Sequence, residues 1–382
     1  NDLEDLKQEV DSGIVTSVSA ARPRPAAGRR GPGALAYLVF SLLVLAAAAV
    51  GYFYWTRQAA PAPGDFLAVE RPARLTSGGN AALAAMSPDG RYVAHVKNDP
   101  GAPSLWMRQA TTTSDVQIVA PAAVRFDGVT FSPEGDHVYY VTYGTTGGIG
   151  TLYRVPALGG TPQKVLEDVD STIAFSPDRA QFAFLRGVPT EGTSYVMLAA
   201  ADGSNVRQLA QLQRPSQFTL NGLTWAEDGR TILAGARTLE GGPHELIVAV
   251  DVATGEFRPL EGRWNSVADL EWVPGTSSFV AVAAEVGLST PQLWQITYPD
   301  GQRRRLTNDL NTYQSVSLSG DARSLATVQT EAVSNLWVSN APDPASAVQI
   351  TRGRGVDLVY LPAPPAAGEG AFHGLAPGHA AR

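Results

Sequence analysis

A large apolar residue followed by a Ser-Pro-Asp-Gly sequence recurs along most of the chain. The pattern is clearest at Met86–Gly90, Phe131–Gly135 and Phe175–Arg179, and degenerate copies begin at Trp225, Trp272 and Leu318. The first residues of successive copies lie 45, 44, 50, 47 and 46 positions apart. Serine, proline and glycine in this order are typical of a type I turn between two strands. Six copies at so regular a spacing predict a repeat protein.

Each turn is followed by runs of strand-forming residues. The second strands are expected at Arg91–Val96, His137–Val141, Gln181–Leu185, Thr231–Ala234, Ser278–Val282 and Ser324–Val328. The third strands are expected at Leu105–Met107, Leu152–Arg154, Tyr195–Met197, Leu246–Val248, Leu293–Gln295 and Leu336–Val338. A short fourth strand ends each unit, as at Gln117–Val119, Arg303–Thr307 and Val348–Thr351. Four antiparallel strands per repeat predict an all-β fold over residues 65–352, a β-propeller of about six four-stranded blades.

Residues 34–55 form 22 consecutive positions without a charge. A helix of this length spans about 33 Å, close to the hydrocarbon thickness of about 30 Å, so we predict a transmembrane helix rather than a core helix or a signal peptide. Four arginines, Arg22, Arg24, Arg29 and Arg30, precede it, and Arg57 alone follows closely. By the positive-inside rule the propeller is expected outside the inner membrane, in the periplasm, and the N-terminus in the cytoplasm.

The remaining segments differ in composition from the repeats. Residues 1–33 are predicted to be a cytoplasmic juxtamembrane segment and linker, and residues 56–64 a Pro/Ala spacer. Residues 353–382 lose the repeat pattern and place prolines where strand hydrogen bonds are required, so we expect a disordered tail, as a shifted reading frame would produce. Because the chain begins at Asn1, we expect it to be part of a longer protein.

Composition excludes several functions. The chain has no cysteine, which rules out a disulfide scaffold, a thiolate metal site and a cysteine nucleophile. A net charge of −7 argues against a nucleic-acid partner. No nucleophile elbow, phosphate-binding loop, H-E-x-x-H or EF-hand pattern occurs, so no catalytic, cofactor-binding or metal-binding residue is predicted and no cofactor is expected.

Other polar and aromatic groups receive structural interpretations. Gly144, Gly147, Gly148 and Gly150 are expected in a hairpin loop, and His95, His137 and His244 in strand or loop packing rather than a shared metal site. Arg303–Arg305 is expected on an outermost strand, where charge blunts edge pairing, with an acidic-ligand patch as the alternative. Asp89, Glu134, Asp178 and Asp228 are interpreted as turn residues rather than calcium ligands. Trp106, Trp294 and Trp337 are expected as core anchors, and Trp225 and Trp272 as rings buried between blades.

The turn motif and its spacing resemble the Pro-Asp-type propeller repeats of the TolB family, which are similar to WD-repeat blades. The resemblance covers residues 74 to about 352. Arg74–Thr76 resembles the fourth-strand endings Arg305–Thr307 and Gln349–Thr351. The resemblance implies that such an N-terminal strand completes the last blade and closes the ring.

A second resemblance concerns Asp2–Gly13, which is similar to the segment after the catalytic domain in bacterial, notably acidobacterial, membrane serine/threonine kinases. In those proteins a kinase, a linker, one transmembrane helix and propeller repeats follow in this order. The resemblance implies an extracytoplasmic sensor module that binds a ligand or protein and signals through dimerisation or reorientation of the helix. The expected partners are the membrane, an unidentified extracytoplasmic ligand or protein, and a second copy of the chain.

Three alternatives remain open: a TolB-like envelope scaffold without a kinase, the propeller of a prolyl-oligopeptidase-type peptidase, and a membrane-bound winged-helix regulator. The flanking reading frame distinguishes them. A His-Arg-Asp loop upstream indicates the kinase, a winged helix upstream the regulator, and G-x-S-x-G downstream the peptidase.

Overall fold

The computed structural model describes residues 67, 72–331, 335–338 and 347–350, which contain β-strands and no helix. Repeats one to three contain β1 (Ala81–Met86), β2 (Tyr92–Lys97), β3 (Ser104–Gln109), β4 (Asp115–Val119), β5 (Val124–Phe131), β6 (His137–Gly144), β7 (Thr151–Pro156), β8 (Gln163–Glu167), β9 (Ala174–Phe175), β10 (Gln181–Val188), β11 (Thr193–Ala200) and β12 (Arg207–Gln213). Repeats four to six contain β13 (Gln217–Trp225), β14 (Thr231–Thr238), β15 (His244–Asp251), β16 (Phe257–Pro259), β17 (Trp264–Trp272), β18 (Ser278–Glu285), β19 (Gln292–Thr297), β20 (Arg303–Arg305), β21 (Thr312–Leu318), β22 (Leu325–Thr330), β23 (Trp337–Val338) and β24 (Val348–Gln349).

Each of the first five repeats is an antiparallel four-stranded unit in chain order, as the sequence pattern predicts. Three of them are separate sheets, and repeats four and five join into one sheet through a single pair, Glu245 with Trp264. The sixth repeat differs. Strands β21 and β22 form one two-stranded sheet, and β23 and β24 form another. Within the described residues, the expectation that these four strands form one sheet is therefore wrong.

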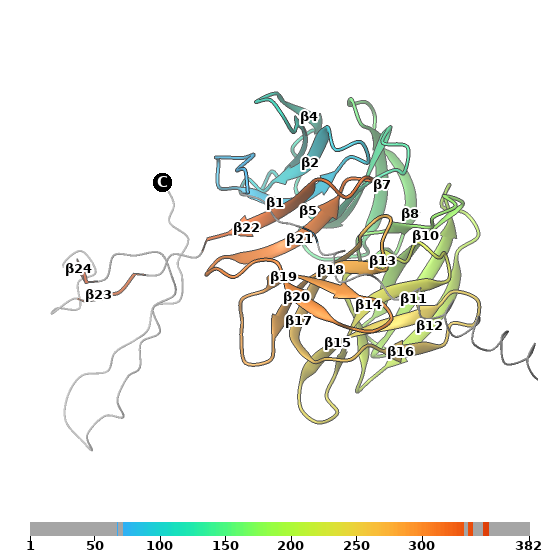
Figure 1. The fold of residues 1–382 in the computed structure, drawn as a ribbon. Helices are drawn as coiled ribbons and strands as arrows, with labels where there is room; N and C mark the ends of the chain where they lie inside the picture. The colour runs from blue at the N-terminus through green and yellow to red at the C-terminus, as the bar shows by residue number, and fades with distance from the viewer. Residues whose placement is uncertain (1–66, 68–71, 332–334, 339–346, 351–382) are drawn as a thin grey trace, which may run out of the picture. The chain divides into compact units, whose positions relative to one another are not determined.

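The sheets follow one another around a ring (Figure 1). The first strands of neighbouring repeats contact each other, and β1 of the first repeat contacts β21 and β22 of the sixth. Two hydrogen bonds join these ends: Met86 N–H donates to Ser317 Oγ at 2.9 Å, and Gly320 N–H donates to Pro88 O at 2.8 Å. A closed ring of sheets with the first strand of each repeat innermost is the architecture of a β-propeller.

The core lies between neighbouring sheets because alternate residues of each inner strand point toward the preceding repeat. In repeat four, Leu223 and Trp225 pack with Leu185 and Val196 of repeat three. Trp225 is 5% exposed, which confirms the expected burial, and Trp272 is half-buried, edge-on to Tyr298 with the ring centroids 6.1 Å apart.

The Ser-Pro-Asp-Gly segments form the predicted turns by local hydrogen bonding. Ser87 Oγ donates to Asp89 Oδ1 at 2.6 Å, and Gly90 N–H donates to Ser87 O at 2.9 Å. Gly90 has φ of 69°, in the left-handed region that glycine adopts without strain. The hydrogen bond between serine and aspartate recurs at Ser176–Asp178 and Ser319–Asp321.

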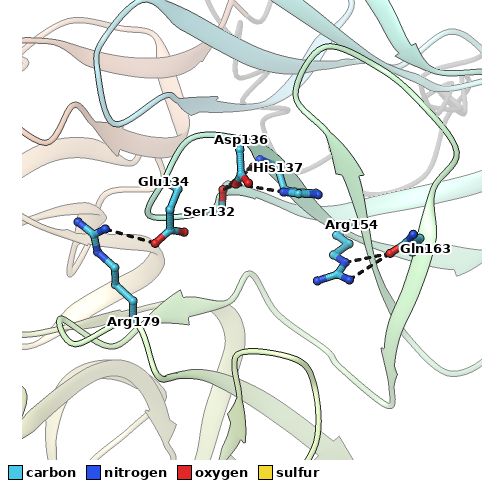
Figure 2. Close-up of polar contacts among 7 residues, drawn as sticks. All are labelled: Ser132, Glu134, Asp136, His137, Arg154, Gln163 and Arg179. Carbon is cyan, nitrogen blue, oxygen red and sulfur yellow. Dashed lines mark hydrogen bonds and ion pairs between the residues drawn. The ribbon is translucent and has the colours of Figure 1, made fainter.

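The second repeat uses a variant of this turn (Figure 2). Glu134 occupies the aspartate position, and the serine hydroxyl of Ser132 donates instead to Asp136 at 2.7 Å. Glu134 is thereby left to accept from Arg179 Nη1 of the next repeat at 3.3 Å. On the outer strands of the same repeat, Arg154 donates twice to Gln163 Oε1. Asp89, Asp178 and Asp228 thus accept hydrogen bonds within their own turns, whereas Glu134 links its turn to the next repeat.

Two expectations about the ends of the repeat array are wrong. Trp337 is 57% exposed rather than a core anchor, because its strand pairs only with β24 among the described residues. Residues 74–76 form no strand, although Arg74 lies 3.2 Å from Glu331, just after β22. By contrast, Trp294 is buried as expected and donates from Nε1 to Ala283 O at 3.1 Å, and Trp106 is half-buried.

The predicted segments 1–33, 34–55, 56–64 and 353–382 lie outside the described residues. Over the part of the chain that the structure describes, no helix is long and apolar enough to cross a membrane.

Candidate functional site

The inner strands of all six repeats surround a cavity of about 710 Å³ at the centre of the ring. Its wall contains residues of β1, β5, β13, β17 and β21, together with the segment that leads into β9. The cavity extends to the turn end of the ring, where Pro88, Pro133 and Pro177 line it. A concave site of this volume is within the range of about 300–1,000 Å³ that small-molecule or peptide side-chain sites occupy.

Side chains of one repeat bind the exposed backbone of the next around this cavity. Each inner strand has an edge without a partner strand, so its N–H groups require other acceptors. Thr224 Oγ1 accepts from Trp272 N–H at 2.8 Å, and Ser317 Oγ accepts from Met86 N–H at 2.9 Å. A hydroxyl group one residue before the end of an inner strand is therefore sufficient to bind the backbone N–H of the next repeat.

Repeat five places two carboxyl groups where they bind the backbone of repeat six. Glu271 occupies the position of Thr224 and accepts a hydrogen bond from the backbone of Leu318. Asp269 lies two residues earlier, on the same face of β17. Its Oδ2 accepts from Val316 N–H and its Oδ1 from Leu270 N–H, both at 2.9 Å. Both acidic side chains line the cavity.

Burial perturbs the ionisation of both groups. Desolvation raises the pKa of Asp269 to about 7, although the backbone hydrogen bonds oppose the shift. Desolvation and the nearby Asp269 charge together raise the pKa of Glu271 to about 8. The pair is therefore expected to be partly protonated at neutral pH, and its charge is sensitive to anything that binds beside it.

The position of Asp269 depends on a glycine in the neighbouring repeat. A Cβ atom at Gly222 of β13 would overlap Asp269 Oδ1 and approach Asp269 Cγ to 3.0 Å. Only glycine lets the two inner strands come this close with the carboxylate between them.

Three buried polar atoms in the cavity wall have no hydrogen-bond partner in the described part of the chain: Ser315 Oγ, Trp225 Nε1 and Trp272 Nε1. Buried polar groups are nearly always paired with protein, water or a ligand. Ser315 is 7% exposed and directly precedes Val316, whose N–H binds Asp269.

A third carboxyl group, Asp127 of β5, also lines the cavity. Burial raises its pKa, the ion pair with Arg125 at 3.1 Å opposes this shift, and the charge of Asp170 adds to it. Asp127 therefore has a cation of its own, unlike the pair on β17.

The structure does not bring the three histidines considered from the sequence together. His95 Nε2 lies 2.9 Å from Asp115, His137 Nδ1 lies 3.0 Å from Asp136, and His244 Nδ1 lies 2.8 Å from Gly242 O. Each contact is thus made within the histidine's own repeat. Within the described ranges, no group of three histidine, aspartate or glutamate residues could hold a metal ion.

The other candidates lie where the sequence placed them. Gly144–Gly150 connects β6 to β7, and Arg303–Arg305 forms β20 at the outer edge of its sheet. Arg303 lies over the ring of Trp264 and Arg305 over that of Trp294, so two of these arginines cover core tryptophans.

Sequence reasoning overlooked Asp269 and Glu271. A signal for both exists in the repeat alignment. At the position of Glu271 the other repeats have Ala85, Thr130, Ala174, Thr224 and Ser317, and at that of Asp269 they have Leu83, Gly128, Thr172, Gly222 and Ser315. Acidic residues occur only in repeat five at these two positions.

No protein-family model and no curated protein sequence matches the chain. Solved structures similar to it include a putative TolB from Agrobacterium tumefaciens, with 16% identity, a TM-score of 0.48, and coverage of 60% of this chain and 82% of that one. TolB from Acinetobacter baumannii has 13% identity, a TM-score of 0.46 and coverage of 66% and 64%. An oligogalacturonate lyase in complex with manganese has 18% identity, a TM-score of 0.48 and coverage of 66% and 74%. The assignment as a β-propeller follows from the strand order and the central cavity.

Proposed function

We propose that this chain is the extracytoplasmic binding module of a single-pass membrane protein, and that its ligand or partner protein binds at the central channel. The observation that carries the proposal is the cavity of about 710 Å³ lined by the inner strands of all six repeats. Its wall combines carboxyl groups of perturbed pKa with unpartnered buried polar atoms, the combination expected of a binding site.

We further propose that the module is the sensor part of a receptor-type serine/threonine kinase. The support is the order of segments in the sequence: an acidic segment similar to those that follow such kinases, then the uncharged run 34–55, then the repeats. Ligand binding would then act on the kinase through dimerisation or reorientation of the single helix.

Site-specific photo-crosslinking in cells tests the binding role. A benzophenone amino acid at Gln314, in the channel wall, should form an adduct with a cellular molecule. The matched control is Val116, which is 55% exposed on the outer part of the first sheet and away from the channel. Equal labelling at both positions, or none at Gln314, contradicts binding at the channel.

Two further experiments test the membrane and kinase parts. A phosphatase reporter fused after residue 352 should be active in the periplasm, and a cytoplasmic report would reverse the proposed orientation. The coding sequence upstream should contain a His-Arg-Asp catalytic loop. A winged-helix domain at that place would show that the protein is a membrane-bound regulator and not a kinase.

A further inference from the structure

The two carboxyl groups on β17 exceed what the ring requires. Thr224 and Ser317 accept the equivalent backbone N–H groups in repeats four and six with hydroxyls, at no cost in buried charge. Glu271 makes the same link with a carboxyl group, and Asp269 adds a second one two residues away. Partly burying two acids where the other repeats have uncharged residues opposes folding, and the ring itself does not require them.

Asp269 and Glu271 have no cation in the described part of the protein that offsets their charge. No lysine, arginine or histidine contributes to the perturbation of either carboxyl group. Among the described residues, Arg179 is the one basic residue in the cavity wall, and its guanidinium is paired with Glu134. The described part of the chain thus supplies no positive group that neutralises this pair, and the cavity has room for one from another molecule.

The arrangement also has unused hydrogen-bonding capacity. Each oxygen of Asp269 accepts one backbone hydrogen bond, and a carboxylate oxygen can accept two. Ser315 Oγ, in the wall of the same cavity, has no hydrogen-bond partner among the described residues, although Ser315 is only 7% exposed. Asp269, Glu271 and Ser315 thus supply three oxygen acceptors, and a primary ammonium group has three N–H donors.

We propose that this site binds the cationic side chain of a lysine or arginine from a peptide segment that enters the channel. The proposal rests on the binding role proposed above and assigns the chemistry of the group that is bound. A metal ion is the less suitable occupant, because no third histidine, aspartate or glutamate joins the pair within the described ranges.

Ionisation of the pair links binding to pH. A carboxylate binds an ammonium group more strongly than a neutral carboxylic acid does. Among the described residues, Asp269 is the one charged side chain that perturbs Glu271, and none perturbs Asp269, although Asp127, Arg179 and Glu227 also line the cavity. The pair on β17 therefore dominates the pH dependence. Affinity for a lysine peptide should therefore rise between pH 6 and pH 8.5.

Calorimetric titration of the full chain tests the proposal. The probe is acetyl-Ala-Lys-Ala-amide, compared with its arginine analogue and with a norleucine analogue of similar length and no charge. The two cationic peptides should bind and the norleucine peptide should bind at least about tenfold more weakly. Glu271→Gln retains an oxygen that accepts the backbone N–H of Leu318. Asp269→Asn retains one oxygen for Val316 N–H and loses the acceptor for Leu270 N–H, which is a small cost that should leave the protein folded. Both variants should lose at least about tenfold in affinity. Asp300→Asn, an exposed turn residue outside the channel, removes the same charge and should bind as the wild type does.

Three results would overturn the assignment: equal binding of the lysine and norleucine peptides, unchanged affinity in both channel variants, or calcium binding by the pair without binding of either cationic peptide. If the cationic peptides fail to bind while the crosslinker at Gln314 still captures a molecule, the cation assignment is wrong and the binding role stands. If both fail, the binding role is wrong as well.

Discussion

Ionisation of the carboxyl pair on β17 should make the propeller less stable as the pH rises. The folded-state pKa values of Asp269 and Glu271 lie above their ordinary values, so between about pH 4 and pH 8 the folded state holds more protons than the unfolded state. The stabilisation is complete below the ordinary pKa values and is lost as the pH rises through the folded ones. The double variant Asp269→Asn and Glu271→Gln has neither ionisable group, so its stability should not show this decrease with rising pH.

The magnitude follows from the size of the shifts. The pKa of Asp269 rises from 3.8 to about 7 and that of Glu271 from 4.5 to about 8. One pKa unit corresponds to about 1.4 kcal/mol, so either group alone would change the free energy of unfolding by about 4–5 kcal/mol. The two titrations are coupled and water in the channel screens both charges, so we expect about 2–4 kcal/mol for the pair. For a domain of this size that corresponds to about 5–10 °C in the thermal midpoint.

This loss of stability with rising pH is checked by thermal unfolding of the wild type and the double variant, measured from pH 5.5 to 8.5 without ligand. At pH 5.5, which is already above the ordinary pKa values, the wild type should unfold at a lower midpoint than the variant, and the difference should widen to several degrees by pH 8.5. Burial lowers the pKa of His95, which makes stability rise with pH, but His95 is present in both proteins and cancels in the comparison. Turn acids such as Asp89 and Asp178 have pKa values below 3.8 and titrate outside this range. Midpoints that differ by less than about 1 °C at every pH would refute the reasoning.

Two substitutions test the packing and the close approach in the ring. Trp225→Ala should lower the free energy of unfolding by about 3–5 kcal/mol in denaturant titrations, because the ring is 5% exposed, whereas Leu158→Ala at an 86% exposed site should change it by less than about 0.5 kcal/mol. Similar effects of the two changes would contradict the assigned core. Gly222→Ala should cost about 2 kcal/mol, because the new Cβ displaces Asp269 from Val316 N–H. In an Asp269→Ala background the same change should cost at least about 1 kcal/mol less, and equal costs would show that the carboxylate is not the obstacle.

The features predicted correctly from the sequence depend on local physics. A serine, a proline and a glycine within four residues determine each turn, and the hydrogen bond from Ser87 to Asp89 spans two positions. Runs of β-branched and aromatic residues determine the strands, so the run predicted at His137–Val141 corresponds to β6. The repeat spacing was sufficient to predict a propeller. The strand at 74–76 and the burial of Trp337 were wrong because both require pairing with distant strands, which local sequence does not specify.

The channel site was decided by tertiary structure alone. Asp269 binds Val316, 47 residues away, and it fits only because Gly222, from a third strand, leaves room beside it. In the sequence, Asp269 and Glu271 directly precede the degenerate turn copy at Trp272, and only the alignment of the repeats marks them as unusual, because acids on a strand are usually solvated. Strand β17 itself places them side by side, and closure of the ring partly removes them from water with no described cation beside them, which raises their pKa values. Local propensity thus determines the repeats, whereas the electrostatics of the channel arise only when distant repeats meet, because desolvation depends on everything that surrounds a charge.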